Sequence, residues 1–104
     1  MVHVIDRLYE TVASRRSADP EKSYTAKLLA GGVERCAKKF GEEAVETVLA
    51  AMKGDKGAIA AESADVLYHL LVLWAASGVE PASVYAALEA REGRSGLEEK
   101  ASRR

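Results

Sequence analysis

Two long segments with helical spacing of apolar residues flank a very short link. The first runs from about Val33 to Lys53 and the second from about Ala58 to Ser77, and only Gly54-Asp55-Lys56-Gly57 separates them. Helices that are joined by so few residues pack as antiparallel neighbours. The pattern therefore predicts a helical hairpin at the centre of the fold, around which the rest of the chain must pack.

Glycine, proline and serine residues divide the rest of the chain into shorter helical segments. A first helix is expected from about His3 to Arg16. Ser23 is a candidate N-cap for a short helix over residues 24–29. A last helix is expected to begin at Pro81 and to end before Gly93.

The length of 104 residues limits the number of domains. A chain of this size builds one modest hydrophobic core and leaves no room for a second domain with its own active site. We expect an all-α fold, with a single domain over residues 1–93 and a polar carboxy-terminal tail over residues 94–104.

The second helix of the predicted hairpin is apolar around its whole circumference, which is typical of a helix that is buried on all sides. The residues concerned are Val66, Leu67, Leu70, Leu71, Val72, Leu73 and Trp74. A single small chain has too little material to cover such a helix, so we expect a homodimer in which helical hairpins form a four-helix-bundle-type core. The simpler alternative is that a few of these side chains are exposed.

The overall charge is close to neutral. A net charge of -1 and a pI near 6.1 provide no basic surface for nucleic acid or for an anionic membrane. No apolar run is expected to reach the length of a membrane-spanning helix, and Asp6 and Arg7 stand where a signal peptide would need an apolar core. We therefore expect a cytoplasmic protein with no nucleic-acid or membrane partner. Cys36 is the only cysteine and is expected to be a buried structural thiol.

Acidic residues gather on one face of the first hairpin helix. Glu42, Glu43 and Glu46 share with Lys39 an arc of about 100° at 3.6 residues per turn. Glutamates are common on a solvated helix face, and that is the simpler interpretation. However, like charges four residues apart repel one another unless a cation neutralises them.

The second hairpin helix carries a matching acidic face. Glu62 and Asp65 are three residues apart and precede the most apolar segment of the chain, and His69 lies one turn further along the same face. Glu46 and Asp65 stand at about the same distance from the hairpin turn. We therefore expect the two acidic faces to meet.

Carboxylates without a cluster of Cys or His favour a hard divalent cation, with Mg²⁺ as the first choice and Mn²⁺ as the second. Such ions beside a lysine are typical of phosphoryl chemistry. The sequence has no glycine-rich phosphate-binding loop and no nucleophile with an adjacent base. The expected reaction is therefore hydrolysis by an activated water molecule.

The acidic pattern also resembles a known signature. Glu42-Glu43-x-x-Glu46 followed by Glu62-x-x-Asp65 resembles the motif of the all-α, MazG-like nucleotide pyrophosphohydrolases. Residues 23–29, 39–46 and 62–71 are similar to the phosphoribosyl-ATP pyrophosphohydrolase family in particular, and the similarity spans nearly the whole chain. The resemblance implies hydrolysis of 1-(5-phospho-β-D-ribosyl)-ATP to the corresponding AMP compound and pyrophosphate, the second step of L-histidine biosynthesis.

The resemblance also implies roles for the acidic residues. The implied metal ligands are Glu43, Glu46, Glu62 and Asp65. Glu42 is implied to be either a further ligand or the group that orients the attacking water. All five acids are therefore candidate catalytic residues.

Five other residues are assigned to substrate binding. Lys39 lies beside the acids and would contact phosphate, whereas Lys27, Tyr24 and Thr25 belong to the short capped helix, which could place hydrogen-bond donors near a phosphate. The alternative is that Ser23 merely caps this helix and that Lys27 is solvated. His69 either contacts the substrate or packs between helices.

Some members of this family are fused to a phosphoribosyl-AMP cyclohydrolase, for which this chain has no room. We expect that enzyme to be a separate protein with a functional link to this one. Two rival hypotheses remain: a housekeeping pyrophosphohydrolase that acts on nucleoside triphosphates or their deoxy forms, and a non-catalytic helical dimer module.

Overall fold

The computed structural model describes residues 3–92, which are helical apart from short connections and contain no strand. This confirms the all-α prediction. The helices are α1 (Val4–Ser14), the short 3₁₀ helix η1 (Arg15–Ser17), α2 (Tyr24–Ala30), α3 (Gly32–Lys53), α4 (Lys56–Ser77) and α5 (Pro81–Glu92). The predicted tail over residues 94–104 lies outside the described residues.

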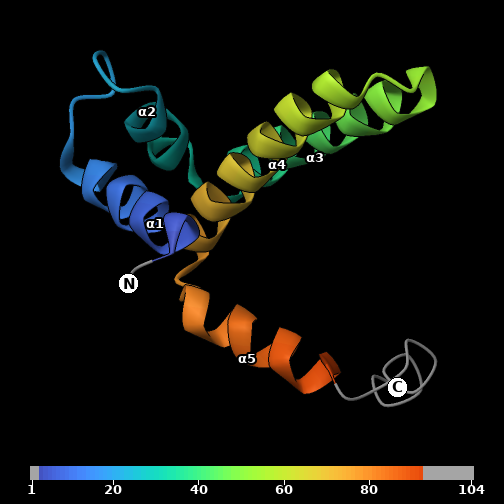
Figure 1. The fold of residues 1–104 in the computed structure, drawn as a ribbon. Coiled ribbons are helices and arrows are strands. Elements are labelled where there is room, and N and C mark those ends of the chain that lie inside the picture. Colours follow the sequence, from blue (N-terminus) through green and yellow to red (C-terminus); the bar gives the residue numbers. More distant parts are fainter. Residues whose placement is uncertain (1–2, 93–104) are drawn as a thin grey trace.

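Helices α3 and α4 form the predicted antiparallel hairpin, which is the longest feature of the molecule (Figure 1). Gly54 ends α3 with a positive φ of 70°, a conformation that glycine adopts without strain. Asp55 then caps α4, because its carboxylate accepts a hydrogen bond from the Ala58 amide at 3.0 Å. The expectation that α4 starts near Ala58 was therefore wrong by two residues, since this cap draws Lys56 and Gly57 into the first turn.

The hydrophobic core lies where α1 and α2 pack against one end of the hairpin (Figure 1). Its centre consists of Val12, Leu28, Cys36, Val72 and Ala75. The Cys36 thiol donates a hydrogen bond to the Leu28 carbonyl at 3.3 Å, and burial raises its pKa. This confirms the prediction of a buried structural thiol.

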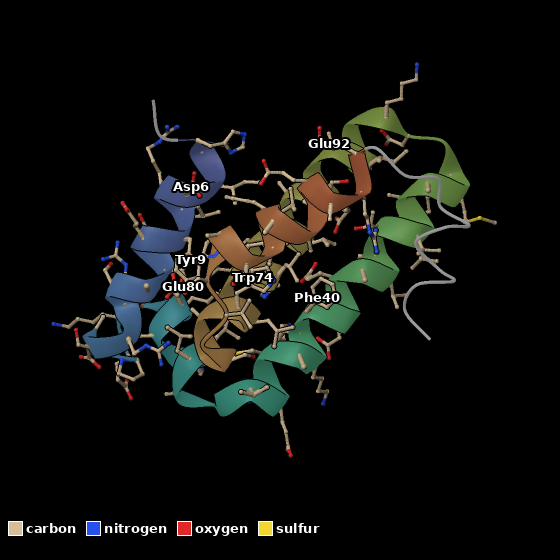
Figure 2. The ribbon with its side chains drawn as sticks, turned by 90° about the horizontal axis from the view of Figure 1, so that it is seen from below. Asp6, Tyr9, Phe40, Trp74, Glu80 and Glu92 are labelled. Carbon is tan, nitrogen blue, oxygen red and sulfur yellow. The ribbon has the colours of Figure 1, made fainter. Side chains whose placement is uncertain are left out.

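Helix α5 leaves the end of α4 and points away from the hairpin (Figure 1). Tyr9 of α1 lies beside the α4–α5 connection near Glu80, and its hydroxyl donates a hydrogen bond to the Val79 carbonyl at 3.3 Å (Figure 2). The Tyr85 hydroxyl donates to the Asp6 carboxylate at 2.8 Å. These two bonds connect α1 with the segment that follows α4.

The far part of the hairpin exposes apolar side chains along one stripe of α3. Val45, Val48, Leu49 and Met52 follow one another at helical spacing and are 57%, 59%, 49% and 81% exposed. A second apolar surface is the groove of about 200 Å³ between α1 and α4, which Val4, Leu8, Leu67 and other apolar residues line. A single chain therefore leaves much of its apolar surface uncovered.

Helix α4 is also, within the described range 3–92, the one helix that is long and apolar enough to cross a membrane by length and composition. The prediction that no apolar run reaches this length was therefore wrong, because only two acids interrupt α4. The same composition is found in core helices of soluble proteins. Asp65 lies near the middle of α4, where a charge costs about 2.5–3.5 kcal/mol in a bilayer.

Candidate metal and nucleotide site

Three of the predicted carboxylates meet between the hairpin helices. Glu43 comes from α3, whereas Glu62 and Asp65 come from successive turns of α4. One carboxylate oxygen from each residue lies within 4.8 Å of the corresponding oxygens of the other two. The hairpin therefore gathers residues that are far apart in the sequence, as the two matching acidic faces predicted.

The electrostatics of this group show the effect of crowding. The pKa of Glu62 is raised, first by partial burial and then by the negative charges of Asp65, Glu43 and Glu46. A cation between these carboxylates would remove that repulsion. Three oxygen donors on two rigid helices fit Mg²⁺, which usually takes a few carboxylates and completes its shell with water and phosphate oxygens.

Glu46 stands next to this group but is not part of it. Its charge acts on Glu62, and the two side chains help to line a cavity of about 200 Å³ that extends toward Lys53 and Asp55 at the hairpin turn. The resemblance implied four metal ligands. The structure brings three of them together, Glu43, Glu62 and Asp65, and places Glu46 beside this group but outside it.

Glu42 has a different partner. Its carboxylate forms an ion pair of 3.1 Å with the Lys39 ammonium, one turn earlier on α3. This contact lowers the pKa of Glu42 and raises the pKa of Lys39. The expected repulsion between Glu42 and its acidic neighbours is therefore partly offset within the chain, by a lysine that stands beside the acids as predicted.

His69 lies behind the carboxylates and is only 5% exposed. Its Nε2 is 3.9 Å from Glu43 Oε1, too far for a hydrogen bond, and its Nδ1 has no hydrogen-bond partner within residues 3–92. Burial lowers the pKa of His69 more than the Glu43 carboxylate raises it. Of the two roles considered for His69, its position favours packing between helices.

Helix α2 joins the site through aromatic contacts. Tyr24 is half exposed, and its ring approaches the His69 ring edge-on, with 6.2 Å between centroids. The ring centroids of Tyr68 and His69 are 4.9 Å apart. The Tyr68 hydroxyl also shares a hydrogen bond of 2.5 Å with the Thr25 hydroxyl. Tyr68 was not among the predicted substrate-binding residues, and its position directly before His69 on α4 was the one sequence signal for this contact.

Residues 20–27 also form a polar cavity of about 410 Å³. Its lining consists of Pro20, Glu21, Lys22, Ser23, Tyr24 and Lys27. Ser23 is the N-cap of α2, as predicted, because its hydroxyl accepts a hydrogen bond from the Ala26 amide at 3.1 Å. Two of the predicted substrate-binding residues, Tyr24 and Lys27, therefore share one cavity, whereas the Thr25 hydroxyl is engaged by Tyr68.

Comparison with known proteins identifies the family. Residues 5–92 match the family described as phosphoribosyl-ATP pyrophosphohydrolase. A phosphoribosyl-ATP pyrophosphatase of Parvibaculum lavamentivorans is 66% identical over 99 residues, which cover 95% of this chain and 91% of the relative. The Azospirillum brasilense protein of the same name is 60% identical over 101 residues, covering 97% and 91%. A Cereibacter sphaeroides protein of that name is 60% identical over 100 residues, covering 96% and 97%. The chain therefore belongs to the phosphoribosyl-ATP pyrophosphohydrolase family.

Proposed function

We propose that the chain hydrolyses 1-(5-phospho-β-D-ribosyl)-ATP to 1-(5-phospho-β-D-ribosyl)-AMP and pyrophosphate, the second step of L-histidine biosynthesis. The observation that carries this proposal is the family match over residues 5–92, which contains every acid of the candidate site. Relatives at 60–66% identity bear the name phosphoribosyl-ATP pyrophosphatase. A non-catalytic helical module does not account for these similarities.

The proposed cofactor is Mg²⁺, held by Glu43, Glu62 and Asp65, with Mn²⁺ as an alternative. The support is the close approach of these three carboxylates and the raised pKa of Glu62. When bound, such an ion would supply positive charge that offsets the negative charge developing on the phosphate. We include Glu46 in the site although it is not one of the three grouped carboxylates, because its negative charge helps to raise the pKa of Glu62.

The remaining residues have separate roles in the proposed reaction. A water oxygen attacks phosphorus and the anhydride bond to the leaving pyrophosphate breaks, so a carboxylate must accept a proton from the water. Glu46 suits this role, since it lies beside the three-carboxylate group without belonging to it. Lys39, held 3.1 Å from Glu42, provides a positive charge for phosphate at the edge of the site.

Substrate preference tests the proposal against its nearest rival. Pyrophosphate release should be measured with enzymatically prepared phosphoribosyl-ATP and, in parallel, with ATP, dATP and dCTP, each with Mg²⁺ and with EDTA. We expect metal-dependent release with a clear preference for phosphoribosyl-ATP. A preference for the plain triphosphates would instead indicate the housekeeping pyrophosphohydrolase.

We also propose a homodimer as the working assembly. The support is the apolar stripe of α3 (Val45, Val48, Leu49 and Met52) together with the uncovered groove between α1 and α4. At about 100° per residue, Leu49 points in nearly the same direction as Glu42 but lies about two turns further along α3, so a second chain packed on the stripe would border the acidic face. Exposed apolar surface of this kind typically marks an interface.

The proposed location is the cytoplasm, where the nucleotide substrate would be met in solution. Asp65 in the middle of α4 argues against a membrane span, and burial of α4 between two chains explains its composition. We further propose that the phosphoribosyl-AMP product passes to a cyclohydrolase on a separate chain.

A further inference from the structure

The cavity over residues 20–27 is the largest of the three described here and has the opposite charge balance from the acidic site. Its charged lining residues are Lys22, Lys27 and one acid, Glu21, around a volume of about 410 Å³. The cavity beside the carboxylates holds Lys53 against Glu46, Asp55 and Glu62 in about 200 Å³. An anion that carries no metal ion with it is therefore attracted to the first cavity and repelled from the second.

A short chain of contacts links the larger cavity to the three-carboxylate group. The Tyr24 ring lines the larger cavity and meets His69 edge-on at 6.2 Å, and His69 Nε2 lies 3.9 Å from Glu43 Oε1. Only two side chains therefore separate the lysine-lined cavity from the three carboxylates. His69 is buried and Tyr24 is half exposed, so a ligand that extends from one site to the other would pass along the outer side of Tyr24.

The substrate class proposed above has two anionic ends. The polyphosphate end must lie at the acids, because carboxylates accept a phosphate only when a cation stands between them. The phosphoribosyl group is attached to the side of the adenine opposite the ribose that carries the polyphosphate. Its 5-phosphate therefore cannot share the cation at the acids. It requires protein cations of its own, and a lysine ammonium is a common partner for phosphate.

We propose that the cavity over residues 20–27 binds this ribosyl 5-phosphate through Lys22 and Lys27, and that it thereby distinguishes phosphoribosyl-ATP from ATP. The Tyr24 ring forms the wall between the two ends of the substrate. Ser23 contributes shape rather than a donor, since its oxygen already caps α2. This inference rests on the proposed function and adds the part of the substrate that confers selectivity.

Calorimetric titration with phosphoribosyl-AMP and with AMP, in the presence of Mg²⁺, tests the proposal. The cation draws the phosphate that both ligands share to the acids and leaves only the ribosyl 5-phosphate for the lysines. Phosphoribosyl-AMP and AMP share one phosphate and differ by the phosphoribosyl group. The wild type should bind phosphoribosyl-AMP more tightly than AMP. Lys27→Gln should weaken phosphoribosyl-AMP binding about tenfold, and Lys22→Gln with Lys27→Gln about a hundredfold, while AMP binding stays unchanged.

Lys56→Gln, which removes an exposed lysine from the first turn of α4, is the matched control and should change neither affinity. Each variant should keep the wild-type circular dichroism spectrum and unfolding midpoint. Equal losses for AMP and phosphoribosyl-AMP, no loss at all, or a wild type that does not prefer phosphoribosyl-AMP would overturn the proposal. A loss confined to AMP would also overturn it, since the cavity would then hold the phosphate of the AMP end.

The outcome is separate from that of the proposed function. If these variants fail to change product affinity while the wild type still releases pyrophosphate from phosphoribosyl-ATP, the subsite assignment is wrong and the activity stands. If the wild type releases no pyrophosphate from phosphoribosyl-ATP, the proposed function itself fails.

Discussion

At the scale of single residues, the five predicted catalytic acids differ in their surroundings. Glu43, Glu62 and Asp65 crowd together, whereas Glu42 pairs with Lys39 at 3.1 Å. The sequence could predict which helix faces carry the acids, because the helical period fixes this. It could not predict which carboxylates meet, since that depends on the side-chain torsions and on the depth of contact between the helices.

This difference predicts unequal effects on metal binding. Glu43→Gln should weaken Mg²⁺ binding by at least the roughly 10- to 100-fold that is typical for lost supporting partners of a metal site. The unfolding midpoint should then no longer rise at millimolar Mg²⁺, because the folded state loses its ligand. Glu42→Gln is the control and should keep most of the rise. Equal shifts in both variants would contradict the assignment of the three-carboxylate group.

The buried His69 predicts a dependence of stability on pH. Its folded-state pKa lies below the ordinary histidine value of about 6.5, so the unfolded chain binds the proton first as the pH falls. The contribution of His69 to the free energy of unfolding is thus fully present above about pH 6.5. It is lost as the pH falls from there toward the folded-state pKa. Urea unfolding between pH 7.5 and 5 measures the loss.

His69→Gln should flatten this part of the pH profile, since the variant no longer has the depressed group. The other histidine, His3, is exposed at the start of α1 and provides the matched variant, His3→Gln, which should keep the wild-type slope. If His69→Gln keeps the slope as well, another group is responsible.

At the scale of elements, glycine and capping signals located the helices to within one or two residues. Ser23 was predicted as the cap of α2 and acts as one, whereas the cap at Asp55 was missed because its residues were assigned to a four-residue link. An aspartate two residues before a glycine, as Asp55 is before Gly57, is typical of a turn. Only the observed hydrogen bond from the Ala58 amide shows that Asp55 caps a helix instead.

The cap gives a prediction for the hairpin. Asp55→Ala should lower the free energy of unfolding by about 1 kcal/mol, because the first turn of α4 loses its side-chain acceptor. Asp55→Asn retains an acceptor at this position and should retain most of the stability. Denaturant titration at one pH compares the three proteins, and equal stability of the alanine variant and the wild type would refute the role of the cap.

At the scale of the whole molecule, the all-round apolar character of α4 indicated that one chain is not enough. The isolated chain leaves the stripe of α3 exposed, with Met52 at 81%, and leaves the groove between α1 and α4 open. The direction of α5 could not be predicted, because few contacts other than the Tyr85–Asp6 bond hold it to the rest of the chain.

A charge in the stripe should therefore disrupt the proposed homodimer. Val48→Asp should shift the protein from dimer to monomer in sedimentation velocity at micromolar concentration, since a buried unpaired carboxylate is costly in an interface. Thr11→Asp adds the same charge at an exposed position of α1 and should leave the dimer intact. A dimer that survives Val48→Asp would place the interface elsewhere.

The central claim is that the three carboxylates of the hairpin serve the hydrolysis of phosphoribosyl-ATP. The most direct test is pyrophosphate release from phosphoribosyl-ATP with Mg²⁺ by the wild type, by Glu43→Gln and by the exposed-lysine control Lys56→Gln. We expect release by the wild type and the control, none with EDTA, and a rate reduced at least about 100-fold in Glu43→Gln. Release by Glu43→Gln at the wild-type rate, or undiminished release in EDTA, would contradict it.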